Sequence, residues 1–412
     1  MDEAPPRALL IYHFFHPDNV VSARLFSDLA LGLHEKGWEV TALTSDRAWA
    51  DPRATFAARE SWQGVAVERA HRPPWDQAKP LERLGNSAWM LGAWLARAAS
   101  MKPFDAVVLG SDPAFAALLF VPLRSLWPRS VFVHWCYDLY PEAIVADGAG
   151  RAVRGVAAAA RKLMKLAYQK CDAIVDLGPR MCERLSEYGG HAEHLTITPW
   201  ALVEPEGAPS AGDERVRQEL FGDARVGLLY SGTLGRAHDF RTFLDLARVC
   251  RKRTGTDIVF CFAGRGARLA ELRSAIETSD TNVRLAPFCD ERDLGARLEA
   301  ADVHLLSLQP AWSGLVVPSK FFGSLAVGRP VLYAGAKDSD VARWVDALDV
   351  GRVVAQETLD STAAYLESLA ASPEALRALQ RRARRTYDEQ FRKEHGVAAW
   401  DALLRRLTRG KG

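Results

Sequence analysis

Apolar residues recur along the chain in short runs that alternate with longer segments of helical periodicity. The runs Ala8–His13 and Glu39–Thr44 are the length of buried strands, and between them Ser22–Glu35 repeats apolar residues three and four positions apart. This spacing predicts a β-α-β unit, with Ser22 as the residue that caps the helix. Such units favour a parallel sheet whose ligands bind beyond the carboxyl ends of the strands.

The same alternation continues to the end of the chain and predicts strands in two groups. Between the groups, Glu204–Asp213 is rich in Pro, Gly and Ser, which is typical of a linker between domains. We therefore expect two doubly wound α/β domains, with the first at residues 1–203 and the second at residues 214–385. The strands expected after the first unit are Val65–Ala70, Asp105–Gly110, Ser130–Trp135, Cys171–Leu177, Val226–Tyr230, Asp257–Ala263, Asn282–Pro287, Val303–Leu308 and Val331–Tyr333.

Composition narrows the class of protein. A chain of 412 residues with 48% hydrophobic residues can bury the cores of two domains, and its net charge of +2 argues against nucleic acid as the main partner. The six cysteines form no Cys-x-x-Cys pair and are expected to be reduced. The sequence shows no signal peptide and no uncharged apolar run long enough to span a membrane, so we expect a cytoplasmic protein.

The segment Gly314–Tyr333 holds the first candidate chemistry. It follows an apolar strand, its helical pattern runs from Lys320 to Ala326, and Gly328 stops the helix. A loop that enters a helix presents free backbone N–H groups, and a lysine in the first turn adds a full positive charge. Together these features suit a diphosphate, although an ordinary strand–loop–helix connection with a surface lysine explains them as well.

A second glycine-containing turn follows the strand Val226–Tyr230. Its residues Gly232 and Gly235 let the backbone approach a ligand, and Arg236 lies next to them in the sequence. Because the turn and Lys320 both follow strands of one predicted sheet, we expect them to flank one site. The first turn of the chain lacks Gly-x-Gly-x-x-Gly, which argues against a nicotinamide enzyme.

These motifs resemble family 4 of the retaining glycosyltransferases, which have the GT-B fold. The resemblance rests on Pro318-Ser319-Lys320, on Leu325-Ala326-Val327-Gly328-Arg329-Pro330, on the run around Asp138 and on the glycine turn. It covers nearly the whole chain, and its most specific motifs lie in the second half. It implies two Rossmann-like domains that face a cleft, with a C-terminal helix at residues 386–412 that returns to the first domain.

The resemblance implies a donor site for a nucleotide diphosphate sugar, expected to be UDP-linked, in the second domain. No other cofactor and no metal is expected. Lys320 and Arg236 would stabilise the leaving diphosphate, with Asp138 as the third catalytic candidate at the sugar. The remaining donor-binding candidates are Gly232, Thr233, Gly235, His238, Arg265, Pro287, Phe288, Gly314, Leu315, Val316, Pro318 and Ser319.

The chain departs from the family pattern at two positions. Family members carry two glutamates near the donor, and Leu315 and Gly323 occupy those slots here. Three functions therefore stay open: an active glycosyltransferase of cell-surface polysaccharide synthesis, a binding or scaffold protein that has lost turnover, and a nucleotide-sugar epimerase of the same fold.

The first half offers candidates for the acceptor. In the family the loop after the first strand faces the acceptor, which implies acceptor-side roles for His16, Asn19 and Ser22; a polar surface loop is the alternative. The partner is then a glycan or a lipid-linked acceptor. For Asp138 the alternative is a turn cap, and His134, inside a strand, is expected to be a core histidine.

Two predicted helices of the first half suggest contact with a membrane. Leu81–Met101 is apolar on more than one face, and Arg151–Lys170 carries several basic residues and no acid. A basic helix can lie on anionic lipid, so peripheral contact with the inner face of the cell membrane is one interpretation. A buried helix and a solvated helical face explain the two patterns equally well.

Overall fold

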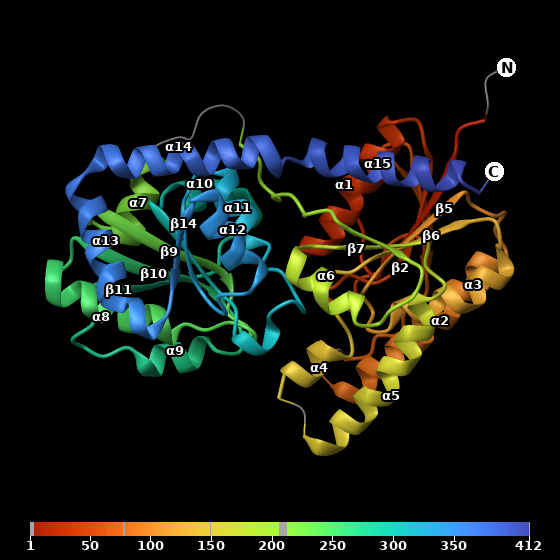
Figure 1. The fold of residues 1–412 in the computed structure, drawn as a ribbon, viewed down its shortest axis with the longest axis horizontal. Helices are drawn as coiled ribbons and strands as arrows, with labels where there is room; N and C mark the ends of the chain where they lie inside the picture. Colours follow the sequence, from red (N-terminus) through yellow and green to blue (C-terminus); the bar gives the residue numbers. More distant parts are fainter. Residues whose placement is uncertain (1–3, 77–78, 149, 206–211, 412) are drawn as a thin grey trace. The chain divides into compact units, whose positions relative to one another are not determined.

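The computed structural model describes residues 4–76, 79–148, 150–205 and 212–411, and it divides into two compact α/β units (Figure 1). The first unit comprises residues 1–199, 314–316 and 393–412, and the second comprises residues 200–313 and 317–392. Of the linker expected at Glu204–Asp213, residues 206–211 lie outside the described part.

The first unit is built on an eight-stranded sheet in the order β3-β4-β2-β1-β5-β6-β7-β8. All neighbouring strands are parallel except the edge pair β3 and β4. The strands are β1 (Arg7–Ile11), β2 (Glu39–Ser45), β3 (Arg59–Trp62), β4 (Val65–Ala70), β5 (Ala106–Gly110), β6 (Val131–Trp135), β7 (Ala173–Asp176) and β8 (Glu193–Thr196).

Helices cover both faces of this sheet, because the chain winds first one way and then the other from β1. The helices α2, α3 and α5 lie on one face, and α1 and α15 lie on the other (Figure 1). The helices of the unit are α1 (Val21–Glu35), α2 (Pro80–Ala99), α3 (Phe120–Leu126), α4 (Glu142–Ala146), α5 (Arg151–Tyr168), α6 (Pro179–Ser186) and α15 (Lys393–Arg409).

The second unit is built on a six-stranded, fully parallel sheet in the order β11-β10-β9-β12-β13-β14. Its strands are β9 (Val226–Thr233), β10 (Ile258–Arg265), β11 (Val283–Ala286), β12 (Val303–Ser307), β13 (Val331–Ala334) and β14 (Gly351–Val354). Its helices are α7 (Glu214–Phe221), α8 (Arg241–Thr254), α9 (Leu269–Ala275), α10 (Glu291–Glu299), α11 (Lys320–Ala326), α12 (Asp340–Leu348), α13 (Leu359–Ala371) and α14 (Pro373–Gln390).

The C-terminal helix α15 packs on the first unit. It contacts α1, the indole N–H of Trp38 donates a 2.7 Å hydrogen bond to Asp401, and Trp400 lies 4.9 Å from the ring of Trp135. The prediction of two doubly wound α/β domains with a C-terminal helix on the first is therefore confirmed.

One local expectation is wrong. Val20, and not Ser22, is the N-cap residue of α1, and no side chain makes a capping hydrogen bond there. Ser22 lies inside the first turn, and its hydroxyl makes a hydrogen bond with Tyr12 instead.

Candidate functional site: the carboxyl edge of the second sheet

The second sheet reverses its winding direction between β9 and β12, which pair directly. Val303 lies opposite Leu228 and His304 opposite Leu229, in parallel register. At such a reversal the loops that follow the two neighbouring strands run in opposite directions. Ligands of open α/β sheets bind in the crevice between these loops. Here those loops are the glycine turn, residues 232–238, and the segment that leads into α11.

Lys320, the first residue of α11, points at the beginning of the glycine turn. Its ammonium donates hydrogen bonds to the hydroxyl of Tyr230 at 3.0 Å and to the carbonyl of Thr233 at 3.3 Å. The ammonium nitrogen also lies 4.4 Å from the centre of the Tyr230 ring, where the π face attracts a cation. The structure thus brings Lys320 and the glycine turn together.

Gly232 makes this approach possible. It has φ +123°, a conformation that only glycine adopts readily, and a Cβ atom there would lie 2.8 Å from Cε of Lys320. Gly232 therefore allows both the path of the turn and the position of the lysine side chain.

The electrostatics of Lys320 follow from its surroundings. Burial lowers the pKa of Lys320 to about 7, because the amine has lost much of its hydration and no carboxylate compensates the charge. An ammonium held in this way gains more than a solvated one from an anion that binds beside it. Its position suits the binding of a phosphate group.

His238 ends the glycine turn as a neutral imidazole. Its Nδ1 atom lies 2.7 Å from the carbonyl of Ser307, which fixes Nδ1 as the donor. Burial first, and the positive charge of Lys320 second, lower the pKa of His238 to about 4. The Arg268 guanidinium donates to the His238 carbonyl and pairs with Glu271. His238 therefore positions the turn and carries no charge near neutral pH.

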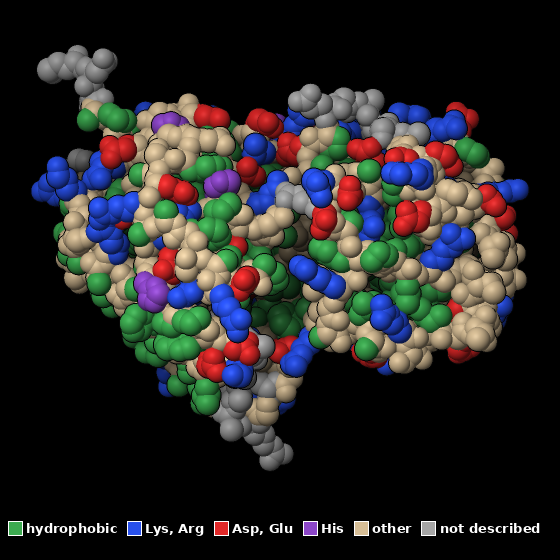
Figure 2. Space-filling model, turned by 180° about the vertical axis from the view of Figure 1, so that it is seen from behind, with side chains coloured by type: hydrophobic (Ala, Val, Ile, Leu, Met, Phe, Trp, Pro, Cys, Tyr) green, Lys and Arg blue, Asp and Glu red, His purple; other side chains and the backbone are tan. Residues whose placement is uncertain are grey.

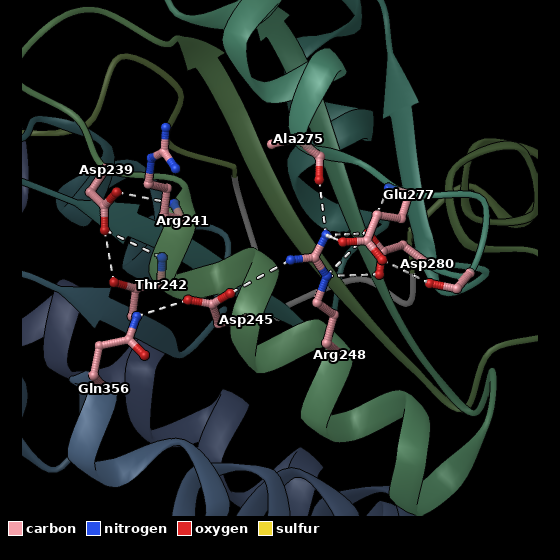
Figure 3. Close-up of polar contacts among 10 residues, drawn as sticks. Asp239, Arg241, Thr242, Asp245, Arg248, Ala275, Glu277, Asp280 and Gln356 are labelled. Carbon is pink, nitrogen blue, oxygen red and sulfur yellow. Dashed lines mark hydrogen bonds and ion pairs between the residues drawn. The ribbon is translucent and has the colours of Figure 1, made fainter.

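Asp239 anchors the glycine turn to the start of α8 (Figure 3). Its carboxylate accepts hydrogen bonds from the N–H of Arg241 at 3.0 Å and from the hydroxyl of Thr242 at 2.7 Å. Its own N–H donates to the hydroxyl of Ser307 on β12 at 3.1 Å. The turn is thus held from both sides, by α8 and by the neighbouring strand.

Arg236 and Gly235 occupy the outer part of the glycine turn. Arg236 is exposed, and the turn closes with a 3.1 Å hydrogen bond from the His238 N–H to the Gly235 carbonyl. Of the two cations expected at this site, Lys320 is held against β9, whereas Arg236 lies on the exposed rim.

The end of β10 holds an exposed pair. The guanidinium of Arg265 lies 4.2 Å from the ring centre of Phe288, whose side chain is 45% exposed. Pro287, just before Phe288, accepts a hydrogen bond from Arg297 through its carbonyl. Flat cationic and aromatic groups of this kind offer a surface on which a nucleobase can stack.

The segment before α11 is divided between the two units. Gly314, Leu315 and Val316 are grouped with the first unit, whereas Pro318 and Ser319 belong to the second and directly precede Lys320. Leu315 is buried, and at Gly323, inside α11, a Cβ would meet no atom within 4 Å. The two slots that hold glutamate in the family therefore offer a buried apolar side chain and open space.

Three first-unit candidates lie on one loop. His16, Asn19 and Ser22 lie on the connection between β1 and α1 or its first turn, beyond the carboxyl end of β1. Asn19 is exposed, and His16 stacks on Trp62 with 4.5 Å between the ring centres. Burial lowers the pKa of His16, which favours its neutral form.

Asp138 follows β6 at the same edge of the first sheet. Burial, helped by the negative charge of Asp112, raises the pKa of Asp138 to about 7. Its backbone N–H donates to the hydroxyl of Ser111 at 3.0 Å, whereas α4 has no side-chain cap. The structure therefore shows no side-chain cap on α4, the helix that follows Asp138.

Several polar side chains that the fold brings together were not predicted from the sequence. Nδ1 of His13, after β1, lies 2.7 Å from the carboxylate of Asp112, after β5, and the buried Arg72 approaches Nε2 of His13 at 3.4 Å. Tyr230 and Arg268 were also missed in the second unit. Tyr230 ends an apolar run, which predicts a core residue. Only its position at the end of a strand could have suggested a role in the site.

His134 is a core histidine, as its position in a strand predicts. It is 1% exposed, and its Nδ1 lies 2.9 Å from the carbonyl of Leu109. Burial lowers the pKa of His134 to about 4.

A pocket of about 680 Å³ lies in the first unit, away from the strand ends described above. Three of its cationic side chains already have partners, because Arg124 and Lys411 both pair with Asp172 and Arg406 pairs with Glu193. Among the described residues, no group of three or more His, Cys, Asp or Glu side chains could hold a metal ion. No helix in the described part is both long and apolar enough to cross a membrane.

Comparison with known proteins gives a match to a family model in the first half of the chain. Residues 22–201 match the family model described as "Glycosyl transferase 4-like domain". The chain carries a glycosyl transferase 4-like domain. This match confirms the resemblance to family 4 that the motifs predict. The glycosyl transferase 4-like domain spans most of the first unit, so it includes the acceptor-side candidate Ser22 and the catalytic candidate Asp138 but not Lys320.

A curated relative and two solved structures extend the match beyond this domain. The "Probable glycosyltransferase WbjE" of Pseudomonas aeruginosa is 25% identical over 251 residues, which are 60% of this chain and 61% of WbjE. The chain thus matches less than two thirds of that relative's length. Two structures show the same GT-B fold. They are Anabaena Alr3699/HepE in complex with UDP (TM-score 0.68, 12% identity, 97% of this chain and 100% of the other) and WaaG, "a glycosyltransferase involved in lipopolysaccharide biosynthesis" (TM-score 0.66, 15% identity, 96% and 99%).

Proposed function

We propose that this chain is a retaining glycosyltransferase that moves a sugar from a nucleotide diphosphate sugar, UDP-linked, to a glycan or lipid-linked acceptor. The proposal rests above all on one observation, the ammonium of Lys320 held against the glycine turn at the reversal point of the second sheet. The family match to a glycosyl transferase 4-like domain and the GT-B fold support it.

The hard step of this reaction is departure of the nucleotide diphosphate, which develops negative charge. In our proposal Lys320 stabilises that charge directly, Arg236 adds a second cation from the rim, and backbone N–H groups of the two loops contribute hydrogen bonds. Such fixed charges and dipoles need no reorganisation when the bond breaks. The departing phosphate accepts the proton of the acceptor hydroxyl on the same face of the sugar, so the anomeric configuration is retained.

The other candidates are assigned around this step. Gly232, Thr233, Gly235, His238, Pro318 and Ser319 shape the diphosphate site, and Arg265, Pro287 and Phe288 receive the base. Gly314, Leu315 and Val316 contribute backbone groups on the donor side. In the first unit Asp138 contacts the reacting sugar or the acceptor, and His16, Asn19 and Ser22 contact the acceptor. A role in cell-surface polysaccharide synthesis is proposed because WaaG, which shares the fold, acts in lipopolysaccharide biosynthesis.

A binding protein without turnover is the second candidate, because Leu315 and Gly323 supply no carboxylate to hold a ribose or a sugar hydroxyl. The test is to incubate the full chain with a panel of UDP-sugars and lipid-linked glycan acceptors, and to follow UDP release. The anomeric configuration of the product is then read by NMR.

Acceptor-dependent UDP release with a retained anomeric configuration is the expected result. An inverted product contradicts the proposed mechanism. UDP-sugar binding without release establishes the binding protein, and an isomerised UDP-sugar formed without acceptor establishes an epimerase.

A further inference from the structure

The exposed hydrophobic side chains of this protein are concentrated on three helices of the first unit. Of the twelve large hydrophobic side chains that are exposed in the described part, eight lie on α2, α3 and α5. They are Leu81, Leu84 and Trp89 on α2, Val121 and Leu126 on α3, and Val156, Leu163 and Leu166 on α5. Scattered single exposed side chains are normal, but a concentration on neighbouring helices marks an interaction surface.

The three helices form one layer. They cover the same face of the first sheet, and α3 contacts both α2 and α5 (Figure 1). Seen from behind, hydrophobic side chains gather at the lower left of the molecule, in the part of the first unit where α2 lies (Figure 2). We call this layer of α2, α3 and α5 the outer helical face.

Helix α5 carries exposed apolar side chains next to its buried side. Its inner side packs on the unit through Ala157, Met164 and Tyr168, which are all buried. Its outer side carries Val156, 69% exposed, and Leu163, 52% exposed, seven residues further on and therefore on the same stripe. Leu166, 53% exposed, lies on the side of the helix that is turned away from the buried residues, so apolar side chains extend well beyond the face that packs on the core.

Basic side chains border this outer stripe. Arg154, Lys162 and Lys165 are exposed, and within the described residues none of the three forms an ion pair. The helix contains no acidic residue between Arg151 and Tyr168. The cations are thus available to an external anion and lie next to the apolar side chains.

Trp89 on α2 adds an amphipathic side chain to the same face. It is 48% exposed, its indole N–H donates a 2.8 Å hydrogen bond to the carbonyl of His71, and its ring meets Trp75 edge to face at 6.3 Å. Tryptophan side chains of this kind, with one polar end and one apolar end, favour the boundary between water and lipid.

We propose that the outer helical face binds the surface of a bilayer that contains anionic lipid. Val156, Leu163 and Leu166 enter the boundary between head groups and acyl chains, and Arg154, Lys162 and Lys165 contact the lipid phosphates. An anionic bilayer matches this combination of exposed apolar side chains on three helices with unpaired cations on α5. The protein would lie on the membrane through this face, and the first unit would meet its acceptor there.

The experiment is flotation of the full chain with vesicles of phosphatidylcholine alone or of phosphatidylcholine mixed with phosphatidylglycerol, without any nucleotide sugar. We expect binding to the mixed vesicles that weakens as salt is added, because salt screens the lysines. Lys162→Glu/Lys165→Glu should lower the partition coefficient by about thirtyfold or more. Leu163→Ser/Leu166→Ser should lower the partition coefficient at low salt and at high salt alike.

Two controls match these variants in chemistry and exposure. Lys252→Glu/Arg273→Glu reverses two exposed charges on the second unit, and Leu285→Ser replaces an exposed leucine there. Both controls should bind vesicles like the unchanged protein. The proposal is overturned if the protein does not float with anionic vesicles, if neutral vesicles bind it equally well, or if the controls lose as much binding as the α5 variants. Because donor and acceptor are absent, the outcome is independent of the proposed activity.

Discussion

The ammonium of Lys320 donates a 3.0 Å hydrogen bond to the hydroxyl of Tyr230, although the two residues are 90 positions apart in the sequence. The Tyr230 hydroxyl in turn donates to the carbonyl of Thr233 at 3.0 Å. One tyrosine at the end of β9 therefore holds both the lysine and the glycine turn. The position of the charge in the donor site depends on this pair.

Tyr230→Phe should destabilise the second unit. Removal of the hydroxyl takes one of two acceptors from the ammonium and one of two donors from the Thr233 carbonyl, and a hydrogen bond contributes about 0.5–1.5 kcal/mol. Chemical denaturation measures this change. Tyr365→Phe is the matched control, because the Tyr365 side chain is half-buried and lies against Arg352 through its ring. A Tyr230→Phe protein as stable as the control would show that the hydrogen bonds contribute little.

Gly232→Ala should impair both folding and donor binding. The methyl group would have to occupy space 2.8 Å from Cε of Lys320 at φ +123°, and strain of this kind costs about 1–3 kcal/mol. The thermal midpoint and the affinity for UDP report the two effects. Gly323→Ala is the contrasting control, because its Cβ meets open space inside α11, and alanine there should stabilise the helix by about 0.5–1 kcal/mol. Equal midpoints for the two variants would contradict this account of Gly232.

Asp138→Asn should stabilise the protein at alkaline pH. Because the pKa of Asp138 is raised to about 7 in the folded state, the folded protein holds more protons than the unfolded chain between its usual pKa and about pH 7. The charged side chain therefore lowers stability as pH rises through this window, and the asparagine variant avoids that loss. Denaturation midpoints at a series of pH values should show the variant more stable at about pH 8, with the advantage gone near pH 4.

The matched control for Asp138 is Glu374→Gln, which removes an exposed carboxylate from the start of α14. Its stability curve should run parallel to that of the unchanged protein. An Asp138→Asn curve that also runs parallel would mean that the carboxyl group is not desolvated.

Much of the fold could be predicted from periodicity and glycine placement. The helix expected from Lys320 to Ala326 has those bounds, and the strand at Val65–Ala70 also agrees in both ends. The short edge strands β3 and β8 were missed, because β3 reads Arg-Glu-Ser-Trp and has little apolar character. The hydrophobic pattern that predicts a strand is weakest in strands at the solvent-exposed edge of a sheet.

The C-terminal segment shows a second kind of limit. Pro373–Leu407 reads as one helical stretch, yet α14 ends at Gln390 and α15 begins at Lys393. Phe391, at the break, is buried and packs 5.3 Å from the ring of Phe322 and 6.2 Å from that of Trp344. A tertiary contact of one aromatic side chain thus interrupts a sequence that local propensity would continue.

The site could be predicted only as far as single strand ends. Lys320 and the glycine turn both follow strands of one parallel sheet, so their convergence could be predicted from the sequence. The partners Tyr230 and Arg268 depend on side-chain direction, and His13 and Asp112 are 99 positions apart. Pairs of this kind leave no spacing pattern in the sequence.

The most direct test of the central claim is calorimetric titration of UDP into the unchanged protein, Lys320→Ala and the control Lys252→Ala, which removes an exposed lysine from the last turn of α8. Loss of a hydrogen-bonded cation should weaken UDP binding by about tenfold to a hundredfold, and the control should bind normally. Since the pKa of Lys320 is lowered to about 7, affinity should also fall as pH rises above neutrality in the unchanged protein and in the control, but not in Lys320→Ala. If Lys320→Ala binds UDP as tightly as the unchanged protein at every pH, Lys320 does not hold the diphosphate.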